Sequence, residues 1–282
     1  VVPIAGDQGV TALTTRYRNR SSSQTSSDLD LSELLGTIHT DSNQNGHGNG
    51  ILGNSPSHVY YAESLFTESI RSVYKNIRML KGWDTPLRSL TISSAEPGDG
   101  KSTIATNLAL VAAAMGQRVL LVDADLRKPQ VHHLMNLANE HGLSDILSSN
   151  QDVQAYLQQV PTGERLTVLT AGQTALDPAS ALSSKKMRLL MEQFQMVFDL
   201  VIYDTPPLVG LADSSIIANH TDGLAMVVKL GKTRAARIKY ALDEMGLHST
   251  PVLGVIVNGS KETDSVLDDY YYRAEPEAVI SN

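Results

Sequence analysis

Apolar residues along the chain fall into short continuous runs and longer stretches with helical spacing. The continuous runs lie at 119–122, 200–203, 224–228 and 252–257, with a shorter strand candidate at 87–93. The helical stretches lie at 57–80, 103–115, 185–198 and 233–245. Strands that are apolar on both faces and alternate with helices are typical of a covered parallel sheet. The pattern therefore predicts an α/β fold, with a mostly parallel twisted sheet and helices on both faces.

The pattern breaks near residue 60. The preceding residues hold tracts rich in serine, asparagine and glycine at 21–27 and 42–50. Such tracts cannot bury enough apolar surface to offset the entropy lost when the chain is ordered. We predict a mostly flexible linker over 1–58, one domain over 59–260 and an acidic tail over 261–282. Within the linker, residues 31–40 could form a short strand or turn.

Composition narrows the classes of function. The 282 residues carry 23 basic and 30 acidic side chains, a net charge of -7, and no cysteine. The chain therefore lacks the global basic footprint of nucleic-acid-binding proteins, and we predict no nucleic-acid partner. The lack of cysteine excludes disulfides, thiolate zinc sites and cysteine-ligated iron–sulfur clusters. No apolar run approaches the ~20 residues of a membrane span. Because the chain begins at Val1, we expect a piece of a longer protein.

A phosphate-binding motif follows the first predicted strand of the domain. Residues 95–103 read AEPGDGKST, which fits the P-loop pattern G-x-x-x-x-G-K-[ST] except that Ala95 replaces the first glycine. Glycines let successive backbone amides turn toward phosphate oxygens, and the following helix N-terminus adds positive partial charge. Lys101 would neutralise the β- and γ-phosphates, and the Ser102 hydroxyl would bind Mg²⁺. The predicted nucleotide contacts are Gly98, Asp99, Gly100, Lys101, Ser102 and Thr103.

Aspartates close two of the buried runs. Asp123 and Asp125 follow the first run, and Asp204 closes the second in a Walker B arrangement that can hold Mg²⁺. Ligands of open α/β sheets bind at the carboxyl ends of the strands. We therefore expect the three carboxylates to lie together beside the P-loop. Asp213, further along, could cap a helix or belong to the outer shell of the metal, and the cap is the favoured interpretation.

Together these segments resemble the Walker A, A′ and B motifs of bacterial tyrosine kinases, P-loop proteins associated with capsule and exopolysaccharide synthesis. The matching segments are 95–103, 122–129 (VDADLRKP) and 204–207 (DTPP). Further matches extend from about Leu31 to Tyr272. The resemblance implies the P-loop NTPase fold and an enzyme that binds and hydrolyses ATP with Mg²⁺ and phosphorylates protein tyrosines.

The resemblance also implies roles for single residues. It places Asp125 and Asp204 on the metal with Ser102, and Asn258 against the nucleotide base. Asp123 is the candidate for orienting or deprotonating the tyrosine hydroxyl, because a phenol of pKa near ~10 is helped by a carboxylate. Asp123 and Asp125 could exchange these roles. The predicted catalytic residues are Lys101, Asp123, Asp125 and Asp204.

The tail carries the consecutive tyrosines Tyr270, Tyr271 and Tyr272. By resemblance these are acceptors that are phosphorylated in trans within a ring-shaped homo-oligomer. The family's interface motif E-x-x-R-x-x-R is matched at Glu68 and Arg71, but Tyr74 replaces the last arginine. A solvated pair of residues three apart on a helix is the alternative interpretation of Glu68 and Arg71.

Family members are fused to, or paired with, a membrane-spanning polysaccharide co-polymerase. The resemblance therefore implies a soluble piece at the cytoplasmic face of the plasma membrane, regulating exopolysaccharide or capsule synthesis and export, with further protein substrates. One alternative is an ATPase switch of the Min and Par type, whose loop carries a lysine where this chain has Glu96. Another is an ATP-controlled assembly platform for a polysaccharide polymerase. Glu96 and the tail tyrosines favour the kinase.

Overall fold

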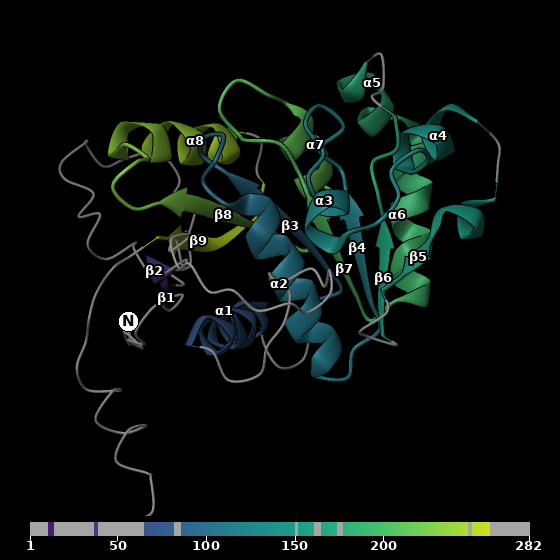
Figure 1. Cartoon of the computed structure of the whole chain (residues 1–282). Helices are drawn as coiled ribbons and strands as arrows, with labels where there is room; N and C mark the ends of the chain where they lie inside the picture. Colours follow the sequence, from purple (N-terminus) through teal and green to yellow (C-terminus); the bar gives the residue numbers. More distant parts are fainter. Residues whose placement is uncertain are drawn as a thin grey trace, which may run out of the picture.

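The computed structural model describes residues 65–81, 86–149, 152–160, 165–173, 177–247 and 250–259, with the backbone of strands at 11–13 and 37–38. The strands are β1 (Thr11–Leu13), β2 (Thr37–Ile38), β3 (Ser89–Ser94), β4 (Val119–Asp123), β5 (Gln158–Gln159), β6 (Leu166–Leu169), β7 (Leu200–Asp204), β8 (Leu224–Lys229) and β9 (Val252–Asn258). The α-helices are α1 (Leu65–Lys81), α2 (Lys101–Ala114), α3 (Val131–Met135), α4 (Leu143–Ser148), α5 (Pro178–Ser183), α6 (Lys185–Val197), α7 (Asp213–Ala218) and α8 (Ala235–Leu247). These elements form one sheet between layers of helices (Figure 1).

The described strands are ordered β1-β9-β8-β3-β7-β4-β6-β5, and β2 also pairs with β9. The six central strands, from β9 to β6, run parallel, while β5 and β1 are antiparallel to their neighbours. Crossover connections through helices allow this parallel pairing. The predicted α/β fold with a mostly parallel sheet is confirmed. The strand that leads into the P-loop, β3, lies between β7 and β8.

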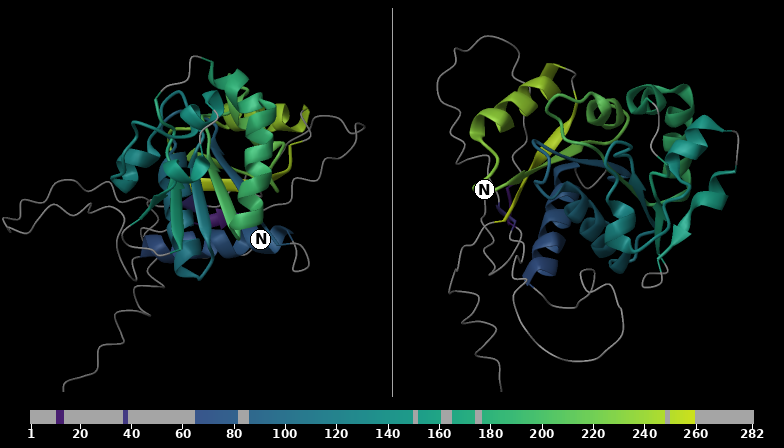
Figure 2. Two further views of the ribbon diagram at one scale, coloured as in Figure 1. Left: turned by 90° about the vertical axis from the view of Figure 1, so that its right-hand side faces the viewer. Right: turned by 45° about the horizontal axis from the view of Figure 1, so that its top comes forward.

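Side chains of the central strands point alternately into two buried cores, as the period of a strand requires. In β4, Val119 and Leu121 pack with the core on the α2 side, whereas Leu120 and Val122 pack with the core on the α6 side. Helices α1 and α2 lie beside one another on the first face (Figure 2). Residues of α6, α7 and α8 pack on the other face. Burial on both faces explains why these strands are continuous apolar runs.

The structure describes the first predicted helix from Leu65 onward. Helix α1 covers residues 65–81, and residues 57–64 lie outside the described part of the chain. Strand β2 falls within 31–40, where the sequence predicts a short strand or turn. The division into linker, domain and tail stays a prediction, because most of the first and third parts lies outside the described residues. None of the helices in the described ranges is long and apolar enough to cross a membrane.

Candidate active site

The P-loop turns from the end of β3 into the first turn of α2. Gly98 and Gly100 have φ angles of 77° and 98°, in the left-handed region that glycine adopts without strain. Gly100 is the N-cap of α2, and no side chain caps the helix. The free amides of a helix N-terminus suit an anion. Ala95, the departure from the P-loop pattern, is fully buried and has no left-handed φ angle, so its methyl group fits at this position.

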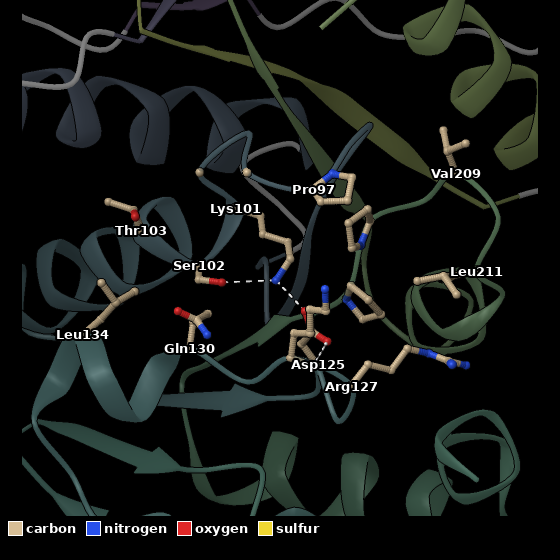
Figure 3. A pocket seen from close by; sticks show the side chains of 15 residues that line it. Pro97, Lys101, Ser102, Thr103, Asp125, Arg127, Gln130, Leu134, Val209 and Leu211 are labelled. Atoms are coloured by element: carbon tan, nitrogen blue, oxygen red, sulfur yellow. Dashed lines mark hydrogen bonds and ion pairs between the residues drawn. The ribbon is translucent and has the colours of Figure 1, made fainter. Parts of the chain in front are cut away.

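The predicted site residues meet at the carboxyl ends of β4 and β7. Lys101 Nζ lies 2.8 Å from Asp125 Oδ2 and 3.1 Å from Ser102 Oγ (Figure 3). It also lies 3.6 Å from Asp204 Oδ1. Asp123 and Asp204 are partners in the register of the two strands. One ammonium group therefore lies against two carboxylates and a hydroxyl, and the Asp123 carboxylate adds to the negative charge around it.

Burial controls the charge of this cluster. It raises the pKa of Asp123 to about 8, and the neighbouring Asp204 carboxylate adds to the shift. Burial also raises the pKa of Asp204, although Lys101 opposes this. Burial would lower the pKa of Lys101, but Asp204 and Asp125 outweigh it and the pKa of Lys101 is raised. The lysine is therefore charged at neutral pH, and the carboxylates exceed it in number.

The donor atoms fit a magnesium ion that binds together with a nucleotide. Both carboxylate oxygens of Asp204 are buried, and among the described residues neither accepts a hydrogen bond of ordinary length, since Lys101 Nζ lies 3.6 Å from Oδ1. In the same part of the chain, no three acidic or histidine side chains form a ready-made metal site. Mg²⁺ is commonly held by one or two carboxylates together with phosphate oxygens and water. The oxygen ligands beside the P-loop are too few to hold Mg²⁺ alone, which suits an ion that is also bound by phosphate oxygens and water.

Asp123 and Asp125 differ in what they face. Asp123 is fully buried, and its oxygens accept backbone amides of Asp125, Gln130 and Val131 at 3.2, 3.2 and 3.0 Å. Asp125 is bonded to Lys101 and lines the cavity described below. Asp123 therefore lies beneath Asp125, closer to the sheet. Which of the two assists the hydroxyl stays a prediction.

A cavity of about 490 Å³ opens in front of the cluster. Figure 3 shows Lys101 within it, with Thr103 and Leu134 to one side and Val209 and Leu211 to the other. Its lining residues come from the P-loop (Pro97, Gly98, Gly100, Lys101, Ser102, Thr103), from the segment after β4 (Asp125, Arg127, Lys128, Gln130, Leu134) and from the segment after β7 (Pro206, Pro207, Val209, Leu211). The cavity thus combines a phosphate site with an apolar wall.

An ion pair between Arg127 and Asp213 holds two of these segments together. The Asp213 carboxylate accepts hydrogen bonds from Arg127 Nε and Nη2 at 2.6 and 3.0 Å and is almost fully buried. The prediction that Asp213 caps a helix is wrong: the N-cap of α7 is Ala212, and Asp213 makes no capping bond. Its carboxylate instead fixes the segment after β4 against α7.

Two predicted nucleotide contacts point into the protein. The Asp99 carboxylate is fully buried and pairs with Lys232 and Thr233, which sequence reasoning did not assign to the site. The Asn258 amide donates to the Asp99 carbonyl, and Asn258 is absent from the cavity wall. A nucleotide contact by the Asp99 backbone amide, or by Asn258 with the base, stays a prediction.

The interface motif is only partly exposed. Glu68 and Arg71 form an ion pair on α1, with 46% and 37% of their side chains exposed. Tyr74, at the third position of the motif, is buried, and its hydroxyl bonds to Gln117. An arginine at position 74 would carry its charge toward the core, which is costly without a partner. The interface role of Glu68 and Arg71 stays a prediction, and the tail tyrosines lie outside the described residues.

Comparisons with known proteins show the family to which the chain belongs. A family model described as "ParA: NUBPL iron-transfer P-loop NTPase" matches residues 87–267. Tyrosine-protein kinase YwqD of Bacillus subtilis (strain 168) is 39% identical over 209 residues, which cover 74% of this chain and 87% of YwqD. The chain belongs to the bacterial tyrosine kinase family, within the ParA-like P-loop NTPases. The family and enzyme class predicted from the Walker motifs are confirmed.

Two solved structures match the fold. The chimerical protein CapA2B2 has a TM-score of 0.67 and 31% identity, and the match covers 71% of this chain and 87% of that one. The kinase domain of Escherichia coli tyrosine kinase ETK has a TM-score of 0.67 and 30% identity over 71% of this chain and 78% of that one. In sequence, the match covers only 26% of the whole Etk protein of Escherichia coli (strain K12).

Proposed function

We propose that this bacterial tyrosine kinase is an ATP-dependent autokinase that phosphorylates Tyr270, Tyr271 and Tyr272 in trans and thereby regulates exopolysaccharide or capsule synthesis and export. The observation that carries the proposal is the Lys101 cluster at the mouth of a cavity with one apolar wall. Phosphoryl transfer requires positioning and charge neutralisation more than covalent chemistry. The P-loop provides the positioning, and Lys101 contributes to the charge neutralisation.

Each residue of the cluster has a distinct task in this proposal. Amides of the P-loop and the α2 N-terminus hold the β- and γ-phosphates, and Lys101 stabilises charge on the oxygens of the transferred group. Ser102, Asp125 and Asp204 hold Mg²⁺, which, when bound, acts as a Lewis acid on phosphate oxygens. Asp123, whose pKa burial raises to about 8, orients the tyrosine hydroxyl and accepts its proton when the carboxyl group is ionised.

The apolar wall fits an aromatic acceptor. Pro206, Pro207, Val209 and Leu211 face the phosphate side of the cavity and offer carbon surface to a phenol ring. Lys128 is exposed at the rim of the cavity. Its positive charge would attract the acidic pair Asp268-Asp269, which precedes the tyrosines, and so favour binding of the tail. These features support a tyrosine in an acidic context as the acceptor.

We place this activity in a larger assembly. The proposed partners are further copies of the chain, in a ring-shaped homo-oligomer, and a membrane-spanning polysaccharide co-polymerase, fused or in trans, at the cytoplasmic face of the membrane. The Min and Par type of switch is disfavoured because Glu96 occupies the position of its signature lysine. The Glu96 carboxylate lies 3.3 Å from Arg237 Nε and so is held by this chain's own helix α8.

The test of the proposal is the covalent product. After incubation of the chain with Mg-ATP, we expect phosphate on Tyr270, Tyr271 or Tyr272, detected by intact mass and mapped by fragmentation. ATP turnover without a mass change, in the chain alone and with a co-polymerase segment supplied, would instead favour the switch or the platform. Phosphate that appears when a Lys101→Met copy is mixed with wild type and is found on the variant's tail would establish transfer in trans.

Assembly and catalysis are separable by changing α1. We expect the double variant Glu68→Ala/Arg71→Ala to lose the homo-oligomer, measured by mass photometry, and to retain phosphotransfer at high protein concentration. An exposed pair of this kind contributes at most about 1 kcal/mol, so the melting temperature should hardly change. Lys75→Ala, an exposed change on the same helix, is the control. An unchanged oligomer in the double variant would show that Glu68 and Arg71 are only a solvated pair.

A further inference from the structure

Asp99 is a buried carboxylate in the middle of the P-loop, with no exposed surface. Its Oδ1 accepts hydrogen bonds from Lys232 Nζ at 3.0 Å and Thr233 Oγ1 at 2.9 Å, and its Oδ2 accepts the amide of Glu96 at 2.9 Å. Its backbone carbonyl accepts Asn258 Nδ2 at 2.8 Å. Four groups therefore converge on one residue of the phosphate-binding loop.

Three of the four partners of Asp99 come from segments that carry none of the proposed catalytic residues. Lys232 and Thr233 lie between β8 and α8, and Asn258 ends β9. Thr233 is itself fixed, because its hydroxyl accepts the amide of Lys229 at 2.9 Å. The ammonium of Lys232 also donates to the carbonyl of Pro97. The outer half of the P-loop is thus tied to the ends of β8, which pairs with β3, and of β9, which pairs with β8.

These bonds act next to the atoms that would hold phosphate. A fully buried carboxylate is strongly unfavourable unless it is paired and hydrogen-bonded, so the loop conformation that pairs Asp99 is selected over others. The next two residues are Gly100, whose φ is 98°, and Lys101. A shift of the loop at Asp99 would move the Lys101 amide and ammonium relative to the phosphates. Misplacement of such groups by as little as about 1 Å can lower catalysis strongly.

The geometry points to Asp99, Lys232 and Thr233 as positioning residues that hold the P-loop in its phosphate-binding conformation. This inference rests on the proposed nucleotide binding by Lys101 and the P-loop. It adds a requirement that the Walker motifs do not contain, namely a lysine and a threonine from the β8–α8 connection. None of the three side chains needs to touch the nucleotide for this role.

The experiment compares Thr233→Val, Lys232→Gln and Asp99→Asn with matched variants. Thr233→Ser keeps the hydroxyl, and Lys239→Gln removes an exposed lysine of α8 that has no bond to the loop. The probe is a fluorescent N-methylanthraniloyl ADP with Mg²⁺, and the Kd is measured by titration. We expect the Kd to rise about tenfold or more in the first three variants and to stay within twofold of wild type in the two matched variants.

Two further readouts distinguish positioning from general stabilisation. Hydrogen exchange of residues 96–103 should become faster in Lys232→Gln and Thr233→Val, while exchange in β4 should stay as in wild type. The melting temperature without nucleotide should remain high enough that all protein is folded during the titration. If Asp99→Asn fails to fold, Lys232→Gln and Thr233→Val carry the test, because their side chains lie nearer the surface.

The outcomes separate this inference from the proposed function. If wild type binds the probe, Lys101→Met does not, and Lys232→Gln and Thr233→Val bind as wild type does, the positioning role is overturned and the nucleotide site stands. A lower melting temperature with an unchanged Kd overturns it as well. If Lys101→Met binds the probe as tightly as wild type, the proposed function itself fails.

Discussion

Replacement of Lys101 by methionine is expected to abolish nucleotide-dependent tyrosine phosphorylation and to leave the fold intact. Lys101 Nζ is the cation bonded to Asp125 and lies 3.6 Å from Asp204. Methionine keeps an unbranched side chain in the same buried space but removes the charge that would neutralise the transferred phosphoryl group. Loss of one such group in other enzymes lowers the rate about 100- to 1,000-fold. Phosphotyrosine formation in single-turnover assays measures the effect.

The charge balance of the free enzyme explains why the fold should survive. Without Lys101, the buried carboxylates lose their cation, and burial alone would keep at least one of them protonated, as it already does by raising the pKa of Asp123 to about 8. Uptake of a proton avoids an unpaired buried charge. The control is Lys239→Met, an exposed lysine on α8, which should retain full activity. Full activity in Lys101→Met, with circular dichroism as in wild type, would refute the assignment of the P-loop.

The Lys101 cluster could be predicted because each of its residues lies at or next to a strand end in the sequence. Asp123, Asp125 and Asp204 follow apolar runs directly, and the P-loop follows β3. In a parallel sheet all such ends lie at one edge, which places these residues on the same side of the sheet. They meet because β7 lies between β3 and β4 in the strand order. Their assignment to metal, base or orienting roles does not follow from position alone. The different burial of Asp123 and Asp125 appears only in the folded chain.

The supporting contacts could not be predicted because they join distant parts of the chain. Asp99 and Lys232 are 133 residues apart, and Arg127 and Asp213 are 86 apart. They meet only because β8 lies beside β3, and because α7 packs near the end of β4. Charged residues in loops are usually solvated, so no local signal marks these pairs as buried. Only the order of strands, which the sequence pattern leaves open, reveals them.

The burial of Tyr74 could have been predicted from the helical spacing of apolar residues in α1, but the interface motif suggested a different role for this position. Ile70, Val73, Tyr74 and Ile77 follow the spacing of one buried helical face, and all four are buried in the structure. Alignment with the interface motif instead grouped Tyr74 with Glu68 and Arg71 as the third position of the motif. Position 74 therefore carries tyrosine instead of arginine because it belongs to the buried face of the helix.

Gly100→Ala is expected to destabilise the protein and to remove nucleotide binding, whereas Gly116→Ala is expected to leave binding unchanged. The two glycines flank α2 and share the left-handed conformation, with φ angles of 98° and 92°. Alanine in that region costs about 1–2 kcal/mol at either site. At Gly116 the added methyl group would meet no atom within 4 Å. At Gly100 it would lie 2.1 Å from Asn258 Nδ2.

This overlap cannot be relieved without loss of a bond. Asn258 is buried, and its amide donates to the Asp99 carbonyl, so either that hydrogen bond breaks or the P-loop moves. Gly100→Ala should therefore lower the free energy of unfolding by roughly 2–4 kcal/mol, against about 1–2 kcal/mol for Gly116→Ala. Urea unfolding gives these free energies, and titration with Mg-bound N-methylanthraniloyl ADP gives the affinity.

Asn258→Ala provides the decisive cross-check, because it removes the atoms with which the new methyl group would collide. If the collision is the cause, Gly100→Ala should cost less in the Asn258→Ala background than in wild type, and the difference is the coupling energy of a double-mutant cycle. Equal costs in the two backgrounds would mean that backbone strain alone accounts for the effect. Equal unfolding energies and affinities for Gly100→Ala and Gly116→Ala would mean that the P-loop tolerates displacement at Gly100. In that case Asn258 would have no part in holding the loop.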